Sequence, residues 1–386
     1  MNRIRVALLV DKAESYDREL IRGILRYSNL STPWEFFFLG PDYTVVREKE
    51  KIVLKTVKWS PDCIVMNDRF SIQDFEELTV PILVTPSIRR INGAINILAD
   101  DSELGSMAAK YFIDKGFSNL AFYGSDRIFW SYDRKVAYRR TVLTAGLKFY
   151  SVESSLYDDW QYNPQQLVPW LKDLPKPVAV FACSDEFGTH LIEAVQMARL
   201  KVPDEVSILG VDNDEFVCGL YGIPMSSIDQ NPEAVGFRIA QHIRSFIVDG
   251  KTLPSEIVGS DFRIITRLST DVFAIDDPQL KTALSFIRQH SETRRITVDD
   301  VVKETHLSRR LLEIRFRKVL NRSILEEVKR VRIGIICMRL TETDDPVGEI
   351  ASQMDFSSQA GFSNFFKKEM NISPVEYRKQ FRKSGR

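Results

Sequence analysis

The chain has 386 residues, of which 44% are hydrophobic and 27% are charged. This length predicts two or three domains, and the composition excludes a disordered or collagen-like chain. Basic and acidic residues are equal at 53 each, yet residues 278–386 hold 22 basic and 14 acidic residues, a net of +8, which leaves −8 for residues 1–277. A basic region behind an acidic body favours a nucleic-acid partner, although a solvated basic surface is the alternative.

The N-terminus does not resemble an export signal. Two arginines precede an apolar run at 6–10, but Asp11 ends this run early and no small-residue cleavage site follows. No apolar run reaches the ~18 residues of a membrane span, so we expect a cytoplasmic protein without a membrane partner. Neither the four cysteines nor the four histidines have metal-like spacing, and therefore no metal and no cofactor are expected.

Residues 1–272 alternate short apolar runs with helical patterns. Eight runs predict buried strands, at 5–10, 34–39, 63–67, 82–85, 95–99, 120–123, 178–182 and 207–211. Apolar residues at helical spacing predict helices around 20–25, 104–112, 191–198 and 235–247. The alternation predicts an α/β fold with parallel sheets and right-handed crossovers.

Polar residues gather where the expected strands end, at 11, 68, 100–101, 124–126, 184–185 and 212–214. Ligands of parallel sheets bind outside the carboxyl ends of the strands. Carboxylates and amides suit a neutral polyhydroxylated ligand there, because they accept hydrogen bonds from hydroxyl groups. Each of these residues could instead cap a helix.

Three motifs in this half resemble the effector domain of lactose-repressor-type regulators: VFACSDEFG from residue 180, VPDEVSILGVDND from 202 and SSIDQ from 226. The resemblance implies a type I periplasmic-binding-protein-like fold, in which two lobes close on a sugar. The lobes would comprise 1–124 plus 231–254, and 125–230 plus 255–272. Effector contacts are implied for Arg134, Asp185, Asp212 and Gln230, and for Ser184, where the family usually has Asn.

The opposite lobe is expected to contribute Asp11, Tyr16 and Asp17, which follow the first strand. Trp130 could stack on a sugar face, or simply pack in the core. The usual N-terminal DNA-binding helices of these regulators are not expected here, because the first expected strand begins near residue 4. This half is therefore expected to sense a ligand without binding DNA.

Residues 280–386 contain no strand candidate. Two segments about 50 residues apart, from Val301 and from Ile350, share a short helix, a tight turn and a second helix that ends on Phe and two cations. Ser308 and Ser357 are placed to cap the second helices, and 324–340 predicts a joining helix. In the two turns, His306 and Asp355 replace the usual left-handed glycine at a cost of about 1 kcal/mol each. The pattern predicts an all-α domain with two helix-turn-helix motifs.

With the motif ISPVEYR at 372, this segment is similar to the AraC-type DNA-binding domain over 280–381. Double-stranded DNA is the implied partner. Base contacts are expected from Arg309, Arg310 and Glu313 in the first unit, and from Gln359 and Asn364 in the second. Phosphate contacts are expected from Ser357, Ser358, Lys367 and Lys368. A solvated helix surface is the alternative for each of them.

A sugar sensor joined by a linker at 273–279 to an AraC-type domain is the arrangement of the xylose-operon regulator family, which the chain resembles over nearly its whole length. The resemblance implies a pentose-responsive transcriptional activator that is a homodimer and works with RNA polymerase. A sensor for a non-sugar effector or a protein partner is the alternative. An enzyme is not expected, because GxSxG, Walker, HExxH and GxGxxG motifs are absent from the sequence.

Overall fold

The computed structural model describes residues 3–11, 13–30, 33–38, 49–153, 164–272, 274, 277–291, 293–320 and 322–381. The chain forms two compact units, Met1–Phe112 with Ser118–Val272, and Ile113–Phe117 with Phe273–Arg386. They are called the N-terminal and the C-terminal unit below. Residues 273, 275 and 276 of the expected linker, and residue 39 of the second expected strand, lie outside the described residues.

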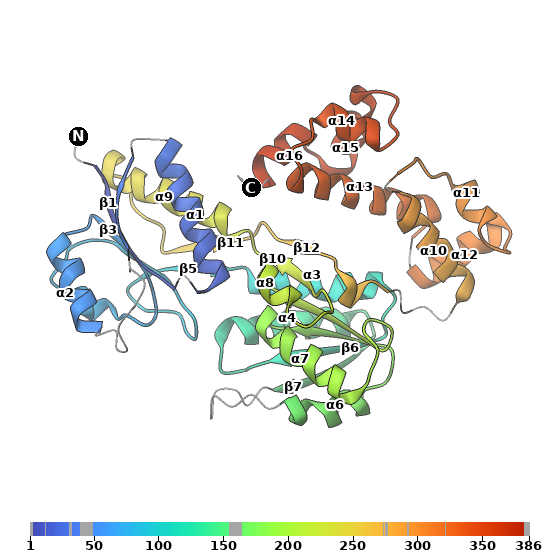
Figure 1. Cartoon of the computed structure of the whole chain (residues 1–386), viewed down its shortest axis with the longest axis horizontal. Coiled ribbons are helices and arrows are strands. Elements are labelled where there is room, and N and C mark those ends of the chain that lie inside the picture. The colour runs from blue at the N-terminus through green and yellow to red at the C-terminus, as the bar shows by residue number, and fades with distance from the viewer. Residues whose placement is uncertain are drawn as a thin grey trace. The chain divides into compact units, whose positions relative to one another are not determined.

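The N-terminal unit has two lobes, each built on a six-stranded sheet (Figure 1). The first sheet has the order β11-β5-β4-β3-β1-β2, and all neighbouring strands are parallel. Its strands are β1 (Arg5–Leu9), β2 (Glu35–Phe38), β3 (Cys63–Asn67), β4 (Ile82–Thr85), β5 (Ile95–Ala99) and β11 (Glu256–Gly259). One core cluster joins this sheet to α1 (Ser15–Leu30) and α9 (Pro232–Asp249). A second cluster packs α2 (Lys49–Trp59) against it. This is the N-lobe.

The second sheet, that of the C-lobe, has the order β12-β10-β9-β8-β6-β7. Only the β10–β12 pair is antiparallel. Its strands are β6 (Asn119–Gly124), β7 (Lys148–Glu153), β8 (Val178–Ala182), β9 (Val206–Val211), β10 (Ser226–Asp229) and β12 (Arg263–Ile265). The accompanying helices are α3 (Asp101–Asp114), α4 (Phe129–Thr144), α6 (Leu167–Asp173), α7 (Asp185–Ala198) and α8 (Glu215–Gly219), with short 3-10 helices at Pro164–Gln166 and Leu268–Thr270. A further 3-10 helix, Ile72–Phe75, packs in the N-lobe.

The expected boundaries of the lobes are wrong at two strands. β6, expected in the first lobe, pairs with β7 and β8 in the second sheet. β11, expected in the second lobe, pairs with β5, with Glu256 beside Asn96. The sequence pattern does not reveal β11, because its side chains are alternately exposed and buried over only four residues.

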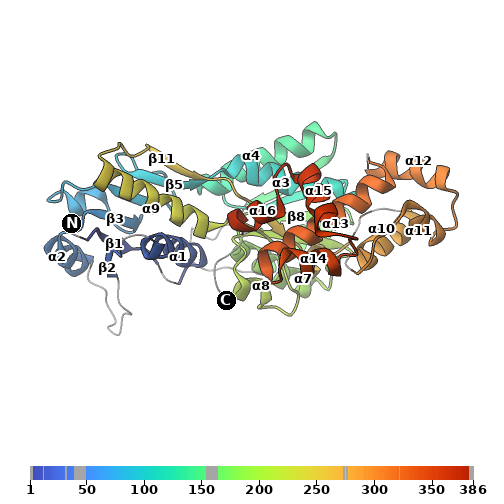
Figure 2. The ribbon, with the colours of Figure 1, turned by 90° about the horizontal axis from the view of Figure 1, so that it is seen from above.

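Two glycines allow α1 and α9 to touch backbone to backbone, and the two helices lie side by side in Figures 1 and 2. A Cβ atom on Gly23 would lie 1.9 Å from the carbonyl oxygen of Glu233, and one on Gly236 would lie 1.9 Å from that of Leu20. This close contact covers one face of the first sheet, where Leu20, Ile24 and Ile239 are fully buried.

The C-terminal unit is helical in its described part. Its helices are α10 (Pro278–His290), α11 (Val298–Lys303), α12 (Arg309–Leu320), α13 (Ile324–Glu342), α14 (Val347–Gln353), α15 (Gln359–Met370) and α16 (Pro374–Phe381). One core cluster contains residues of α10, α11, α12 and the start of α13. Another contains residues of the end of α13 with α14 and α15, and Tyr377 of α16 packs against it. The long helix α13 therefore belongs to both helix-turn-helix motifs.

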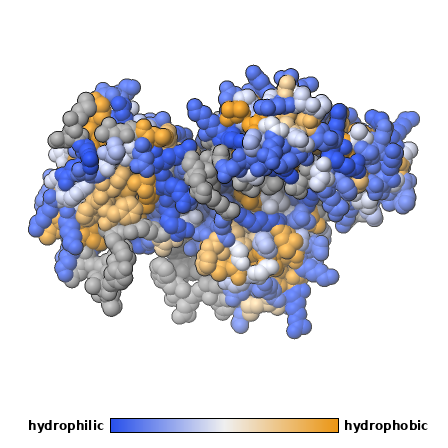
Figure 3. Space-filling model, turned by 45° about the horizontal axis from the view of Figure 1, so that its top comes forward, coloured by the Kyte–Doolittle hydropathy of each residue, from blue (hydrophilic) through white to orange (hydrophobic). Residues whose placement is uncertain are grey.

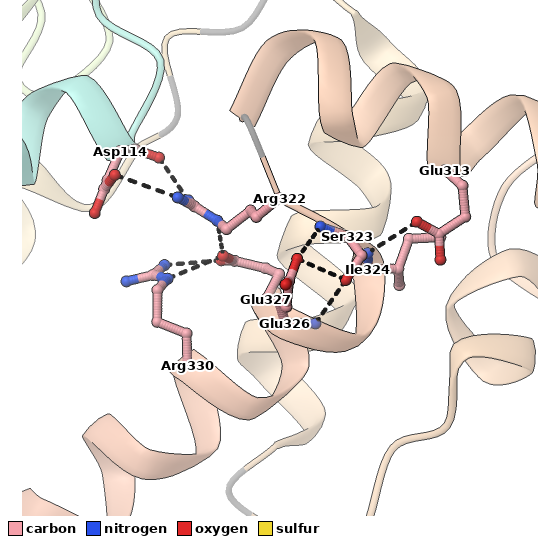
Figure 4. A network of polar contacts seen from close by, with 8 residues as sticks. All are labelled: Asp114, Glu313, Arg322, Ser323, Ile324, Glu326, Glu327 and Arg330. Carbon is pink, nitrogen blue, oxygen red and sulfur yellow. Dashed lines mark hydrogen bonds and ion pairs between the residues drawn. The ribbon is translucent and has the colours of Figure 1, made fainter. Parts of the chain in front are cut away.

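A network of charges fixes the start of α13 (Figure 4). Glu327 is fully buried, and its carboxylate accepts hydrogen bonds from Arg322 Nε at 2.5 Å and from Arg330 Nη2 at 2.8 Å. Arg322 also donates to the carbonyl oxygen of Asp114 at 2.8 Å. Ser323 and Glu326 form a capping box. Among the described residues, no helix is long and apolar enough to cross a membrane.

Candidate effector site and nucleic-acid interface

Side chains from both lobes come together around Tyr16. Tyr16 and Asp17 belong to the first turn of α1, and Asp212 follows β9 in the other lobe. Burial, followed by the negative charges of Asp17, Asp212 and Asp101, raises the pKa of the Tyr16 hydroxyl, which the charge of Arg134 lowers. The three carboxylates and the guanidinium therefore act on one small region between strand ends.

Arg134 is buried and oriented by the protein. Its Nε donates to Asp101 Oδ1 at 2.8 Å, and its Nη1 donates to the carbonyl oxygen of Cys183 at 2.5 Å. Its guanidinium carbon lies 4.8 Å from the ring centre of Trp130. Within the described residues Nη2 has no hydrogen-bond partner, so Arg134 is a fixed donor with one nitrogen left for a ligand oxygen.

Asp212 and Gln230 form a second polar pair in this region. Asp212 has a φ of 110°, and its Oδ1 accepts a hydrogen bond from Gln230 Nε2 at 2.5 Å. Burial raises the pKa of Asp212 to about 7, against the lowering effect of the Arg134 charge. Gln230 Oε1 is buried and has no hydrogen-bond partner in the described residues. A buried acceptor without a donor is costly, and a ligand hydroxyl would satisfy it.

Asp17 and Asp11 line the N-lobe side. Asp17 is buried and accepts a hydrogen bond from the backbone N–H of Asp11 at 2.8 Å. Burial raises the pKa of Asp17 to about 7. Asp11 is paired with Arg69 at 2.7 Å, beside a pocket of about 180 Å³ at the carboxyl ends of β1 and β3. The pocket is lined by Leu9, Val10, Asp11, Lys49, Ile52, Asn67, Arg69 and Phe70.

The side chains of Asp185 and Ser184 form their hydrogen bonds within the C-lobe and not towards the region around Tyr16. The Asp185 carboxylate accepts hydrogen bonds from Ser227 Oγ at 2.6 Å and from the backbone N–H of Asp214 at 2.9 Å. A Cβ atom on Gly210 would lie 2.2 Å from Asp185 Oδ1, so this packing requires glycine. Ser184 Oγ caps α7. In this structure Asp185 positions the loop that carries Asp212.

In the first helix-turn-helix motif, α12 is anchored by Leu312 and Phe316, which are fully buried. Arg310 is exposed, and so is Arg309, which is paired with Asp299 at 3.2 Å. Glu313 is half-buried, and its carboxylate accepts a hydrogen bond from the backbone N–H of Ile324 at 3.4 Å, which turns it towards α13 (Figure 4).

In the second motif, the helix starts one residue later than expected. Ser358, not Ser357, caps α15 and accepts a hydrogen bond from the backbone N–H of Gly361 at 3.1 Å. The predicted contacts Asn364, Lys367 and Lys368 are exposed. Gln359 is exposed too, but its Oε1 reaches over Gly348 of α14, where a Cβ atom would lie 3.0 Å away.

The two turns differ from each other. Asp355 has a φ of 57°, as expected of a residue in the place of a turn glycine. Its carboxylate accepts a hydrogen bond from the backbone N–H of Arg295 at 3.1 Å, which offsets part of the backbone cost. His306 has no positive φ, so that expectation is wrong. Its backbone N–H donates to Gln279 Oε1 at 2.8 Å instead, and this bond holds the first turn.

Two family models match the chain. A periplasmic binding protein-like domain matches residues 109–270, and a helix-turn-helix domain matches residues 301–380. The xylose operon regulatory protein of Haemophilus influenzae is 27% identical over 97% of this chain and 98% of its own length. That of Escherichia coli K12 is 26% identical over 97% of both chains. The chain is therefore similar to the xylose operon regulators over nearly its whole length.

A solved structure of this family shares the fold. The structure described as the xylose-binding transcription activator xylR is 23% identical, covers 99% of this chain and 100% of its own, and has a TM-score of 0.59. The periplasmic binding protein-like match lies almost wholly in the N-terminal unit, and the helix-turn-helix match lies in the C-terminal unit. Both matches fit a DNA-binding transcription regulator with a sensor domain.

Within this regulator, Tyr16, Asp17, Arg134, Asp212 and Gln230 are the predicted effector residues that the structure brings together. Asp11 lies beside the neighbouring pocket. Asp101 is not among the predicted effector residues. Its signal is visible in the sequence, because it directly follows a strand and precedes a helix, but only the fold shows that it meets Arg134.

Proposed function

We propose that this regulator binds a pentose between its two lobes and activates genes of pentose catabolism. The observation that carries the proposal is the set of buried polar groups with unused capacity: Gln230 Oε1 beside Asp212, and Arg134 Nη2. The relatives named as xylose operon regulatory proteins support a pentose as the ligand. The chain is proposed to have no enzymatic activity, and the cytoplasm is its proposed location.

The chemistry of the site suits sugar hydroxyl groups. A sugar hydroxyl donates one hydrogen bond and accepts others. Asp17, Asp212 and Gln230 Oε1 supply acceptors, and Arg134 Nη2 supplies a donor. An anionic ligand is disfavoured, because three carboxylates, those of Asp17, Asp101 and Asp212, act on this region against one guanidinium. A neutral sugar has no such penalty.

Ligand binding is proposed to favour the closed arrangement of the lobes. The N-lobe and the C-lobe share polar contacts, since Trp130 Nε1 donates to the carbonyl oxygen of Ser87 at 2.8 Å and Arg18 lies 3.6 Å from Asp214. A sugar that contacts both lobes adds binding free energy only when they are closed, and it shifts the equilibrium by that difference.

The regulator is proposed to act as a homodimer with RNA polymerase as a further partner. Apolar side chains are exposed on and after α8, with Phe216 at 75%, Leu220 at 50% and Tyr221 at 37%. Figure 3 shows apolar patches on the visible face of the N-terminal unit. Contiguous exposed apolar surface is typical of protein interfaces. Sedimentation of the Phe216→Asp variant, compared with the parent chain, tests this part.

The sugar proposal is tested by thermal unfolding with D-xylose, L-arabinose, D-ribose and D-glucose, followed by calorimetric titration. A pentose at ~100 times its Kd should stabilise the N-terminal unit by about 2.7 kcal/mol. Asp212→Ala should weaken binding at least tenfold. Asp204→Ala, which changes an exposed aspartate, is the matched control and should bind normally.

No shift with any of these sugars would contradict a pentose sensor and favour a non-sugar effector or a protein partner. Unchanged affinity in Asp212→Ala would leave sugar sensing intact but place the ligand elsewhere. A shift with D-glucose alone would keep the sensor and overturn the pentose.

A further inference from the structure

The outward face of α12 carries two branched apolar side chains. Leu311 is 40% exposed and Ile314 is 52% exposed, whereas Leu312 and Phe316 on the opposite side are fully buried. Residues three apart lie on the same face of a helix. Leu311 and Ile314 therefore form one short apolar stripe that the core of this motif does not use.

Cations accompany this stripe. Arg310 and Arg317, which are exposed and seven residues apart, lie along one side of it, and the exposed Lys318 follows Ile314 by four residues on the stripe itself. An apolar stripe beside cations matches the major groove of DNA. There, phosphates line both edges, and the 5-methyl group of thymine is the apolar feature of the base edges. This charge pattern favours DNA over a second copy of the chain as the occupant.

The second recognition helix has a different surface at the same places. A shift of 50 residues relates the two helices, because it carries Ser308 to the cap Ser358 and Phe316 to the buried Phe366. The same shift carries Leu311 to Gly361 and Ile314 to Asn364. One helix therefore presents two apolar groups where the other presents a glycine and an amide, so the two helices offer different contacts to the bases.

We propose that Leu311 and Ile314 determine sequence specificity by contacting thymine methyl groups in the segment of the site read by α12. The inference rests on the DNA-binding function and specifies what that function recognises. Burying one methyl group contributes about 0.8 kcal/mol, which corresponds to about a fourfold change in affinity.

The test uses deoxyuridine, which differs from thymidine only by the missing 5-methyl group. The full chain first selects duplexes from a randomised pool. Each thymidine of the best duplex is then replaced singly, and binding is measured at constant salt. Replacement at one or two positions should weaken binding about fourfold each. The variants Ile314→Ala and Leu311→Ala each lack one of the two side chains. At the thymidine that the missing side chain contacts, replacement by deoxyuridine should not weaken the binding of that variant further.

Val375→Ala is the matched control, because Val375 is 62% exposed on α16 of the same unit. It should keep the full sensitivity to deoxyuridine. Thermal unfolding of each variant shows whether it is folded. We expect all three variants to fold, because the three side chains are exposed.

Equal affinity for thymidine and deoxyuridine at every position would overturn the inference, and so would undiminished sensitivity in both alanine variants. If these variants instead sediment as smaller species than the parent, the stripe is a contact between copies, which also overturns it. Selection of no duplex at all would contradict the DNA-binding function itself, and the inference with it.

Discussion

The fold disfavours the charged form of the Asp17 carboxyl group. It is only 5% exposed, and burial raises its pKa to about 7. The folded chain therefore binds a proton at this residue up to about pH 7, whereas the unfolded chain releases it near pH 4. Between these values the folded state holds more protons, so the free energy of unfolding falls as the pH rises.

Replacing Asp17 with Asn should remove this cost. We expect Asp17→Asn to stabilise the N-terminal unit by about 1–3 kcal/mol at pH 8 and to have no such effect at pH 4. Urea unfolding at both pH values measures the difference. Asp204→Asn, at an exposed position, should change neither. If the Asn variant is less stable at pH 8, the carboxylate contributes more as an acceptor than its burial costs.

At the scale of elements, the α1–α9 contact depends on two glycines. A Cβ atom at position 23 would overlap the backbone of α9, which a rotamer change cannot relieve. We expect Gly23→Ala to destabilise the N-terminal unit by about 1–3 kcal/mol, although alanine favours a helix over glycine. Gly219→Ala in α8, where a Cβ atom meets nothing within 4 Å, is the control and should be neutral or slightly stabilising. Thermal unfolding distinguishes the two.

The start of α13 depends on the charge of Glu327. Burial raises the pKa of Glu327, but the hydrogen bond and charge of Arg330 and those of Arg322 outweigh it, and the net pKa is lowered. Removing the charge leaves two arginines facing an uncharged amide. Breaking a buried ion pair costs about 3–5 kcal/mol, and somewhat less here because Arg330 is partly exposed.

We expect Glu327→Gln to destabilise the C-terminal unit by about 2–4 kcal/mol at pH 7. Because the pKa is lowered in the folded state, this stability is present above the unfolded value and is lost as the pH falls through the folded one. The difference between parent and variant in urea unfolding should therefore shrink in acid. Glu304→Gln, which changes an exposed glutamate, is the control. A constant difference at all pH values would contradict the role of the charge.

At the scale of the whole molecule, the sequence predicts those features that depend on local pattern, such as the bounds of buried strands. β3, β4 and β8 have the expected bounds because they are buried without interruption, and β5 has them because only its two end residues are half-buried. Which sheet β6 and β11 join depends on pairing with strands that lie far away in the chain, and no local pattern encodes such pairing. The inward turn of Asp185 likewise depends on Gly210, a residue of another strand.

The uneven charge of the chain makes a prediction about DNA binding. Residues 278–386 carry a net of +8 on a chain that is neutral overall. The logarithm of the DNA affinity should fall linearly with the logarithm of salt, by about 0.9 for each phosphate neutralised. Lys367→Ala should reduce this slope by about one unit, and filter binding at several salt concentrations measures it. A salt-independent affinity would contradict the assigned interface.

Because α13 contributes to the cores of both motifs, the two recognition helices cannot slide apart. Its 19 residues span about 28 Å, close to the ~34 Å of one turn of DNA. With a rigid spacer of this length, both recognition helices can bind only if the two recognised DNA segments face the same side of the duplex. An insertion of about five base pairs between the two recognised segments, half of the ~10 in one turn, would place one of them on the far side of the duplex, where a single copy of the chain cannot follow.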